Sequence, residues 1–111
     1  MNISSDSRFV DVAIQKAFYA LDNGDEQERA LFKSINHALD TIEKNAFSGI
    51  QIPKRLIPKS YIHKYSVKNL WKYNLPQGWR LIYSIINDNI VVVCLVLDWL
   101  NHTDYEKKFK Y

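Results

Sequence analysis

Hydrophobic residues in the first half of the chain recur at the spacing of amphipathic helices. The first such segment carries its apolar side chains on one helical face, at Val10, Ile14, Ala17, Phe18 and Leu21. A second segment repeats the pattern with Leu31, Ile35, Ala38, Leu39 and Ile42. Residues 5–7 offer N-caps for the first helix, and Asp25 marks the start of the second. The short link between them predicts an antiparallel helical hairpin within residues 1–49.

The second half of the chain has the pattern of strands. Three such runs cover residues 69–75, 79–86 and 90–97. The separating segments, 76–78 and 87–89, are short enough to predict antiparallel hairpins. The first run alternates, so Leu70, Lys72 and Asn74 should face one side of the sheet and Trp71, Tyr73 and Leu75 the other. The last run is apolar at every position, which predicts that both its faces are buried or that it lies centrally in the sheet.

These elements predict one α+β domain over residues 1–111. The helical hairpin should cover one face of a three- to four-stranded antiparallel sheet. Residues 50–68 contain Pro53 and Pro58 and are expected to be a basic connector, with a short helical turn near 60–64. Residues 69–111 should form the sheet and a short C-terminal tail or helix.

Composition adds limits on class and location. A chain of 111 residues with 47% hydrophobic and 24% charged residues is typical of a single globular domain. One cysteine cannot form an intramolecular disulfide, and the N-terminal residues lack the pattern of a secretory signal. The longest uncharged apolar run, residues 90–97, is too short to cross a membrane. A cytoplasmic protein without a membrane partner is therefore expected.

Charge is strongly segregated along the chain. Residues 44–87 contain eight Lys or Arg and no Asp or Glu, whereas residues 1–43 contain eight acids and four bases. Tyr and Trp residues alternate with these cations, a pattern typical of surfaces that bind single-stranded nucleic acid. The alternative is that the aromatic rings belong to the core and the lysines only keep a strand edge from aggregating.

One segment resembles a known family. Gly78-Trp79-Arg80-Leu81-Ile82-Tyr83 begins a strand and is followed by a turn, a valine-rich strand and the tail His102-Thr103-Asp104-Tyr105. This order resembles the RelE/ParE toxin superfamily, whose members also have two N-terminal helices packed on a sheet. The resemblance implies a type II toxin that cleaves messenger RNA, with the ribosome as a further partner. A small acidic antitoxin protein would cover its basic face.

The resemblance also implies a reaction and a site. The ribose 2′-hydroxyl would attack the adjacent phosphorus without a metal or other cofactor, leaving a 2′,3′-cyclic phosphate. Arg80 would bind the phosphate, His102 would transfer a proton, and Tyr105 would stack on a base. The expected path of the RNA follows the basic segment and its aromatic residues: Lys54, Arg55, Lys59, Lys64, Lys68, Lys72, Trp71 and Tyr73.

Departures from the family pattern keep other interpretations open. The strand before Arg80 offers Lys72 where some members have two lysines, and residues 98–101 lack a tail arginine. A ParE-like toxin that inhibits a protein target such as DNA gyrase is one alternative. A nucleic-acid-binding protein without catalysis is another. Arg80 would then be a surface arginine that pairs with Asp98 or Asp88. The histidines and the single cysteine show no metal-ligand spacing.

Overall fold

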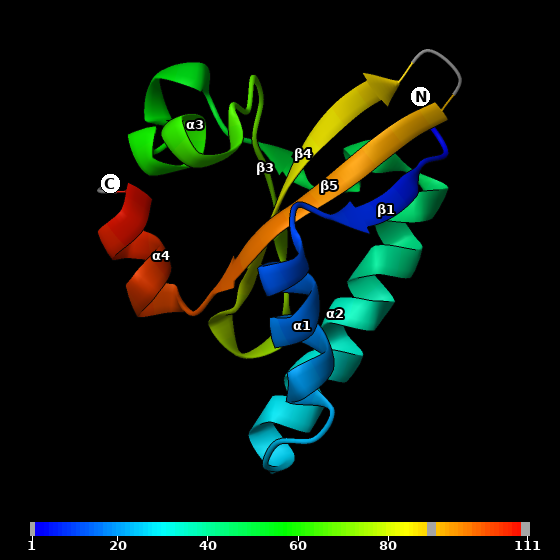
Figure 1. Cartoon of the computed structure of the whole chain (residues 1–111), viewed down its shortest axis with the longest axis vertical. Helices are drawn as coiled ribbons and strands as arrows, with labels where there is room; N and C mark the ends of the chain where they lie inside the picture. The colour runs from blue at the N-terminus through cyan, green and yellow to red at the C-terminus, as the bar shows by residue number, and fades with distance from the viewer. Residues whose placement is uncertain (1, 89–90, 110–111) are drawn as a thin grey trace.

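The expected helical hairpin is present in the computed structural model, which describes residues 2–88 and 91–109 (Figure 1). It consists of α1 (Val12–Leu21) and α2 (Glu26–Lys44). Asp11 caps α1 by accepting a 2.8 Å hydrogen bond from the amide of Ile14. Asp25 caps α2 in a capping box with Glu28, in which each side chain accepts a hydrogen bond from the other residue's amide. The fold is α+β, as the sequence pattern predicts.

The sheet has five strands and is mixed, which corrects the expected antiparallel sheet of three to four strands. Its order is β1-β5-β4-β3-β2. The strand missing from the prediction is β1 (Asp6–Phe9), which pairs in parallel with β5 (Val91–Leu100). None of residues 5–7, expected as helix caps, caps α1, because the helix starts later than its apolar pattern does and Asp6 and Ser7 lie within β1. Four residues of mixed polarity become a strand only because β5 offers a free edge.

The remaining strands are antiparallel. β3 (Trp71–Asn74) pairs with β4 (Arg80–Asp88), β4 pairs with β5, and the two-residue β2 (Ile50–Gln51) pairs with β3. Between β3 and β4 the chain turns through the short 3-10 helix η3 (Pro76–Gly78), where Gln77 and Gly78 have φ of 63° and 79°. A bulge between Ile82 and Tyr83 shifts the register of β4 against β5. Asn87 and Asp88, expected in the turn at 87–89, instead belong to β4 and pair with Val92 and Val91, because the hairpin strands extend further than their apolar runs. Asn89 and the expected start at Ile90 lie outside the described residues.

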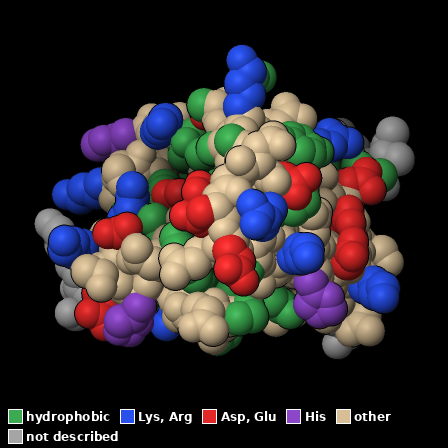
Figure 2. All heavy atoms as spheres, turned by 90° about the horizontal axis from the view of Figure 1, so that it is seen from below, with side chains coloured by type: hydrophobic (Ala, Val, Ile, Leu, Met, Phe, Trp, Pro, Cys, Tyr) green, Lys and Arg blue, Asp and Glu red, His purple; other side chains and the backbone are tan. Residues whose placement is uncertain are grey.

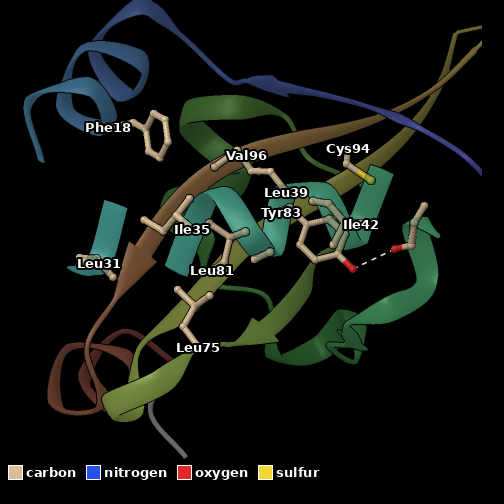
Figure 3. Packing of buried hydrophobic residues seen from close by; sticks show 12 residues of the cluster. Phe18, Leu31, Ile35, Leu39, Ile42, Leu75, Leu81, Tyr83, Cys94 and Val96 are labelled. Atoms are coloured by element: carbon tan, nitrogen blue, oxygen red, sulfur yellow. Dashed lines mark hydrogen bonds between the residues drawn. The ribbon is translucent and has the colours of Figure 1, made fainter. Parts of the chain in front are cut away.

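The hydrophobic core on one face of the sheet lies under α1 and α2 (Figure 3). There Leu81, Tyr83, Cys94 and Val96 from β4 and β5 meet the buried residues of the two helices. The α2 chain then turns through η1 (Ala46–Ser48) into β2. This layer is the one that the helical periodicity predicts.

The opposite face of the sheet has a second core, which the sequence pattern did not predict. It is covered by η2 (Lys54–Leu56), α3 (Lys59–Tyr65) and α4 (His102–Phe109), all on the side of the sheet away from the hairpin (Figure 1). Leu70, Ile82 and Leu97 are almost fully buried beneath them. The expected connector therefore contains α3 around the predicted helical turn, and the expected tail is α4. The last apolar run is an interior strand, and Cys94, Val96 and Leu97 bury it on both faces, whereas Val91 at its start is exposed and Ile90 lies outside the described residues.

Among the helices of the described residues, none is long and apolar enough to span a membrane.

Candidate functional site

Two cations of the predicted site are neighbours on the sheet. Lys72 of β3 pairs in register with Ile82, and Asn74 pairs with Arg80. Arg80 lies two residues before Ile82 on β4, so both side chains face the same side of the sheet, and Lys72 faces that side too because it pairs with Ile82. Lys72 and Arg80 are therefore diagonal neighbours on the face covered by α3 and α4. Both are half-buried. The sheet thus holds two positive charges at the end of the β3–β4 hairpin.

Tyr105 of α4 holds these two cations in place. The Nζ of Lys72 lies 5.0 Å from the centroid of the Tyr105 ring, and the guanidinium carbon of Arg80 lies 5.4 Å from it. The ring also stacks on Phe109, with centroids 4.4 Å apart. Aromatic faces attract cations within about 6 Å. Because Tyr105 is only 2% exposed, its ring is covered by protein, and the structure places it as a support for the cations rather than as an open platform for a base.

The guanidinium of Arg80 is anchored to the preceding turn. Its Nη1 donates a 2.6 Å hydrogen bond to the carbonyl of Gly78. Its Nε is buried and has no hydrogen-bond partner among the described residues. Asp98, considered above as a partner for Arg80, makes other contacts. Its carboxylate accepts hydrogen bonds from the hydroxyl of Tyr61 and from the amide of Trp99. The side chain of Asp88 lies outside the described residues.

His102 lies at the same turn. A Cβ placed on Gly78 would be 3.5 Å from the Cβ of His102, so the first residue of α4 lies against the turn that anchors Arg80. The imidazole is exposed, and its Nε2 lies 2.8 Å from Oε1 of Glu106, one helical turn later. Arg80 of β4 therefore lies with His102 and Tyr105 of α4 around one end of the sheet.

Asp98 forms a second polar contact beneath α3. Its carboxylate accepts a 3.0 Å hydrogen bond from the hydroxyl of Tyr61, which is buried. Burial raises the pKa of Asp98 above the usual range, while the hydrogen bond from Tyr61 and the nearby Lys108 oppose this shift. Burial also raises the pKa of Tyr61, and the charge of Asp98 adds to that effect. The contact joins β5 to α3 and leaves a partly buried carboxyl near Lys64 and Lys108.

Five of the predicted RNA-binding cations belong to one exposed layer. They come from η2, α3 and the segment after α3, which lie together on one side of the sheet (Figure 1). These exposed side chains are Lys54, Arg55, Lys59, Lys64 and Lys68. The acid-rich residues 1–43 form β1, α1 and most of α2, and both helices cover the opposite face. The sheet therefore separates a basic layer from an acidic one.

The two predicted aromatic contacts do not join this surface. Trp71 and Tyr73 are half-buried and pack against the core under the helical hairpin. The Trp71 ring lies 5.4 Å from Phe47 and 6.3 Å from Tyr83, measured between centroids. The strand alternation predicts that Trp71 and Tyr73 face away from Lys72, and the structure agrees. It places them on the other side of the sheet from Arg80 and from the basic layer.

Glu106 and Tyr61 are contacts that the sequence pattern did not predict, and Asp98 was expected only as a partner for Arg80. Glu106 carried a usable signal, since it follows His102 by four residues, which is the spacing of neighbours on a helix. That signal depends on treating the tail as helical. The Tyr61–Asp98 contact joins residues 37 apart and depends on how α3 folds over the sheet. Local sequence patterns carry no signal for it.

Known proteins offer no relative of this chain. No protein-family model, no curated protein and no solved structure matches the chain. Within residues 2–88 and 91–109, no group of three or more His, Cys, Asp or Glu side chains lies close enough to hold a metal ion. The candidate site consists of Lys72, Arg80, His102, Tyr105 and Glu106.

Proposed function

We propose that the protein is a RelE-like endoribonuclease that cleaves messenger RNA by attack of the ribose 2′-hydroxyl on the adjacent phosphorus. The observation that supports the proposal is the clustering of Lys72 and Arg80 on the ring of Tyr105, beside the turn that His102 contacts. Two neighbouring cations can stabilise the negative charge that grows on a pentacoordinate phosphorus. An exposed imidazole next to them can exchange a proton with the sugar.

In the proposed reaction, each group has one task. The Nε2 of His102 is engaged with Glu106, so Nδ1 is the nitrogen that accepts the proton of the 2′-hydroxyl. The 2′ oxygen then forms a bond to phosphorus while the bond to the 5′ oxygen breaks, and the products are a 2′,3′-cyclic phosphate and a 5′-hydroxyl. Arg80 binds the phosphate oxygens, because a guanidinium matches them with two donors. The Lys72 ammonium supplies the proton for the leaving 5′ oxygen.

The RNA would reach this site across the basic layer. Exposed cations of η2 and α3 lie on the same side of the sheet as Arg80 and His102. Their field attracts a polyanion before specific contacts form. The proposal keeps the expected antitoxin as the partner that would cover this layer in the resting cell, and it keeps the ribosome as a further partner.

The test is to induce the protein in growing cells and to map the ends of cellular RNA. Wild type should arrest growth and produce new 5′-hydroxyl ends. Arg80→Ala should slow cleavage by about 10²–10³, and His102→Ala by about 10²–10⁴. His37→Ala, an exposed histidine of α2 in the other layer, is the matched control and should be silent. Growth arrest with intact messenger RNA, unchanged by both site variants, would overturn the nuclease proposal.

One observation favours a second candidate, a protein of the same fold that binds its target without cleaving it. Arg80 is already bound to the carbonyl of Gly78 and packed on Tyr105, and His102 is paired with Glu106. These contacts would hold the groups equally well in a surface that only recognises a nucleic acid or a protein such as DNA gyrase. The RNA-end experiment separates the two candidates, because only the nuclease produces new ends that depend on Arg80.

A further inference from the structure

A groove on the hairpin side of the molecule is separate from the site described above. It has a volume of about 880 Å³ and lies between the start of α2 and the η3 turn. Two half-buried tryptophans, Trp79 and Trp99, lie on its sheet side, and Leu21, Ala30 and Leu31 lie on its helix side. Trp99 is held by an edge contact with Phe18, whose ring centroid is 6.3 Å away. The groove therefore has a built aromatic wall.

The charged residues that line this groove are all acidic. Asp25, Glu26 and Glu28 lie along it, and none of its described lining residues is Lys, Arg or His. Asp25 and Glu28 are held in the capping box, while Glu26 is exposed in the first turn of α2. Viewed from below, acidic side chains spread across the middle of the surface, with basic side chains among them and around them (Figure 2). A carboxylate rim repels phosphate, so this groove is not part of an RNA path.

We infer that the groove binds a basic peptide segment of a partner protein, with arginine side chains stacked on Trp79 or Trp99 and facing the carboxylates. Arginine pairs with carboxylates and also lies flat on indole rings, so it fits both walls at once. Aromatic side chains and arginine are enriched at protein–protein contacts, and complementary charge selects the partner. An acidic segment, such as one that would cover the basic layer, does not fit here.

The test uses the tryptophans as reporters. The chain has three tryptophans, and Trp71 does not line the groove, so Trp71→Phe leaves fluorescence from Trp79 and Trp99. The probe is a ten-residue peptide of alternating arginine and leucine, added to the protein. The matched probe has glutamate in place of arginine. Saturable quenching by the basic peptide and none by the acidic one is the expected result.

Two charge variants decide whether the binding belongs to the groove. Glu26→Lys should weaken binding at least tenfold, because it places a cation beside the bound arginine. Asp40→Lys changes the net charge equally but lies on α2 outside the groove, and it should leave binding within twofold. Trp79→Leu is a second variant and should weaken binding of the basic peptide, read from the fluorescence of Trp99. Equal weakening by the two lysine variants, tighter binding of the acidic peptide, or no saturable binding would overturn the inference.

Discussion

The hydroxyl of Tyr83 donates a 2.8 Å hydrogen bond to the backbone carbonyl of Ala46, joining the central strand β4 to the end of the helical hairpin (Figure 3). The same oxygen accepts a hydrogen bond of 3.1 Å from the amide of Gly49. Tyr83 and Ala46 are both fully buried, and burial raises the pKa of the phenol. One side chain thereby satisfies two backbone groups where the chain passes from α2 to β2.

Tyr83→Phe should destabilise the fold. The substitution keeps the ring but leaves the buried Ala46 carbonyl without a donor, which costs about 1–3 kcal/mol. Each kcal/mol should lower the melting temperature by about 4–8 °C in a domain of this size. Tyr19→Phe is the control, because Tyr19 is 54% exposed on α1 and should change little. Equal melting temperatures for both variants would contradict the role given to Tyr83.

Gly49→Ala should lower the free energy of unfolding more than the addition of one methyl group suggests. A Cβ at Gly49 would lie 2.5 Å from the carbonyl oxygen of Lys72 and 2.6 Å from the Tyr83 hydroxyl. The first neighbour is backbone, so β3 or η1 must move. At Gly24 the contacts are with the side chain of Glu28, which can turn away at the cost of the capping box. Urea unfolding should show a larger loss for Gly49→Ala than for Gly24→Ala.

Asp98 should make stability fall as pH rises above about 4, the ordinary pKa of an aspartate. Burial raises its pKa in the folded state, so between the unfolded and folded pKa the folded protein binds the extra proton. The unfolding free energy therefore decreases as pH rises through that window. Asp98→Asn removes this titration and can keep partners for Tyr61 and the Trp99 amide. Urea midpoints should depend less on pH in Asp98→Asn than in wild type, whereas Asp40→Asn, at an exposed position, should follow wild type.

The elements with strong local patterns could be predicted, and those defined by distant pairing could not. The apolar stripe from Leu31 to Ile42 and the cap at Asp25 are sufficient to place α2. By contrast, β1 has an exposed charge at Asp6 and at Arg8, and it is a strand only through its pairing with β5. Its parallel direction follows from the route of the chain, which no local pattern records.

The same distinction applies to the candidate site. Strand alternation was enough to put Lys72 on the face opposite Trp71, but it does not say which helices cover each face. The family resemblance implied that Tyr105 stacks on an RNA base, and the tail pattern gave no sign that α4 folds back onto the sheet. Once α4 covers that face, the ring of Tyr105 becomes the support for Lys72 and Arg80. The role of an aromatic residue thus depended on a layer that the periodicity did not reveal.

Tyr105 should act on cleavage through the two cations. Tyr105→Phe keeps the aromatic face and should retain most of the activity of wild type. Tyr105→Leu removes that face and should lower the rate by about tenfold, as expected when about 1–2 kcal/mol of cation–π contact is lost. The measurement is the rate of RNA cleavage by the two Tyr105 variants. A second measurement adds free guanidinium to Arg80→Ala, and the response of its cleavage rate reports whether the phosphate-binding position is still formed. Equal rates for the two Tyr105 variants would contradict a role in positioning.

Binding of RNA should depend on the exposed cations of the basic layer and on salt. If the layer makes about five phosphate contacts, the affinity for single-stranded RNA should fall with a log–log slope of about −3.5 against salt concentration. Replacing Lys59, Lys64 and Lys68 by Glu should abolish this binding while leaving the melting temperature nearly unchanged, because all three side chains are exposed.

Lys72 is left intact in this variant, since its half-buried ammonium packs on Tyr105 and its reversal would disturb the site itself. Replacing Lys16 and Lys33, exposed on α1 and α2, by Glu is a control for the position of the reversed charges, with a smaller change in net charge, and should retain most of the affinity. A slope near zero, or equal losses in both sets, would remove the basic layer as the RNA-binding surface.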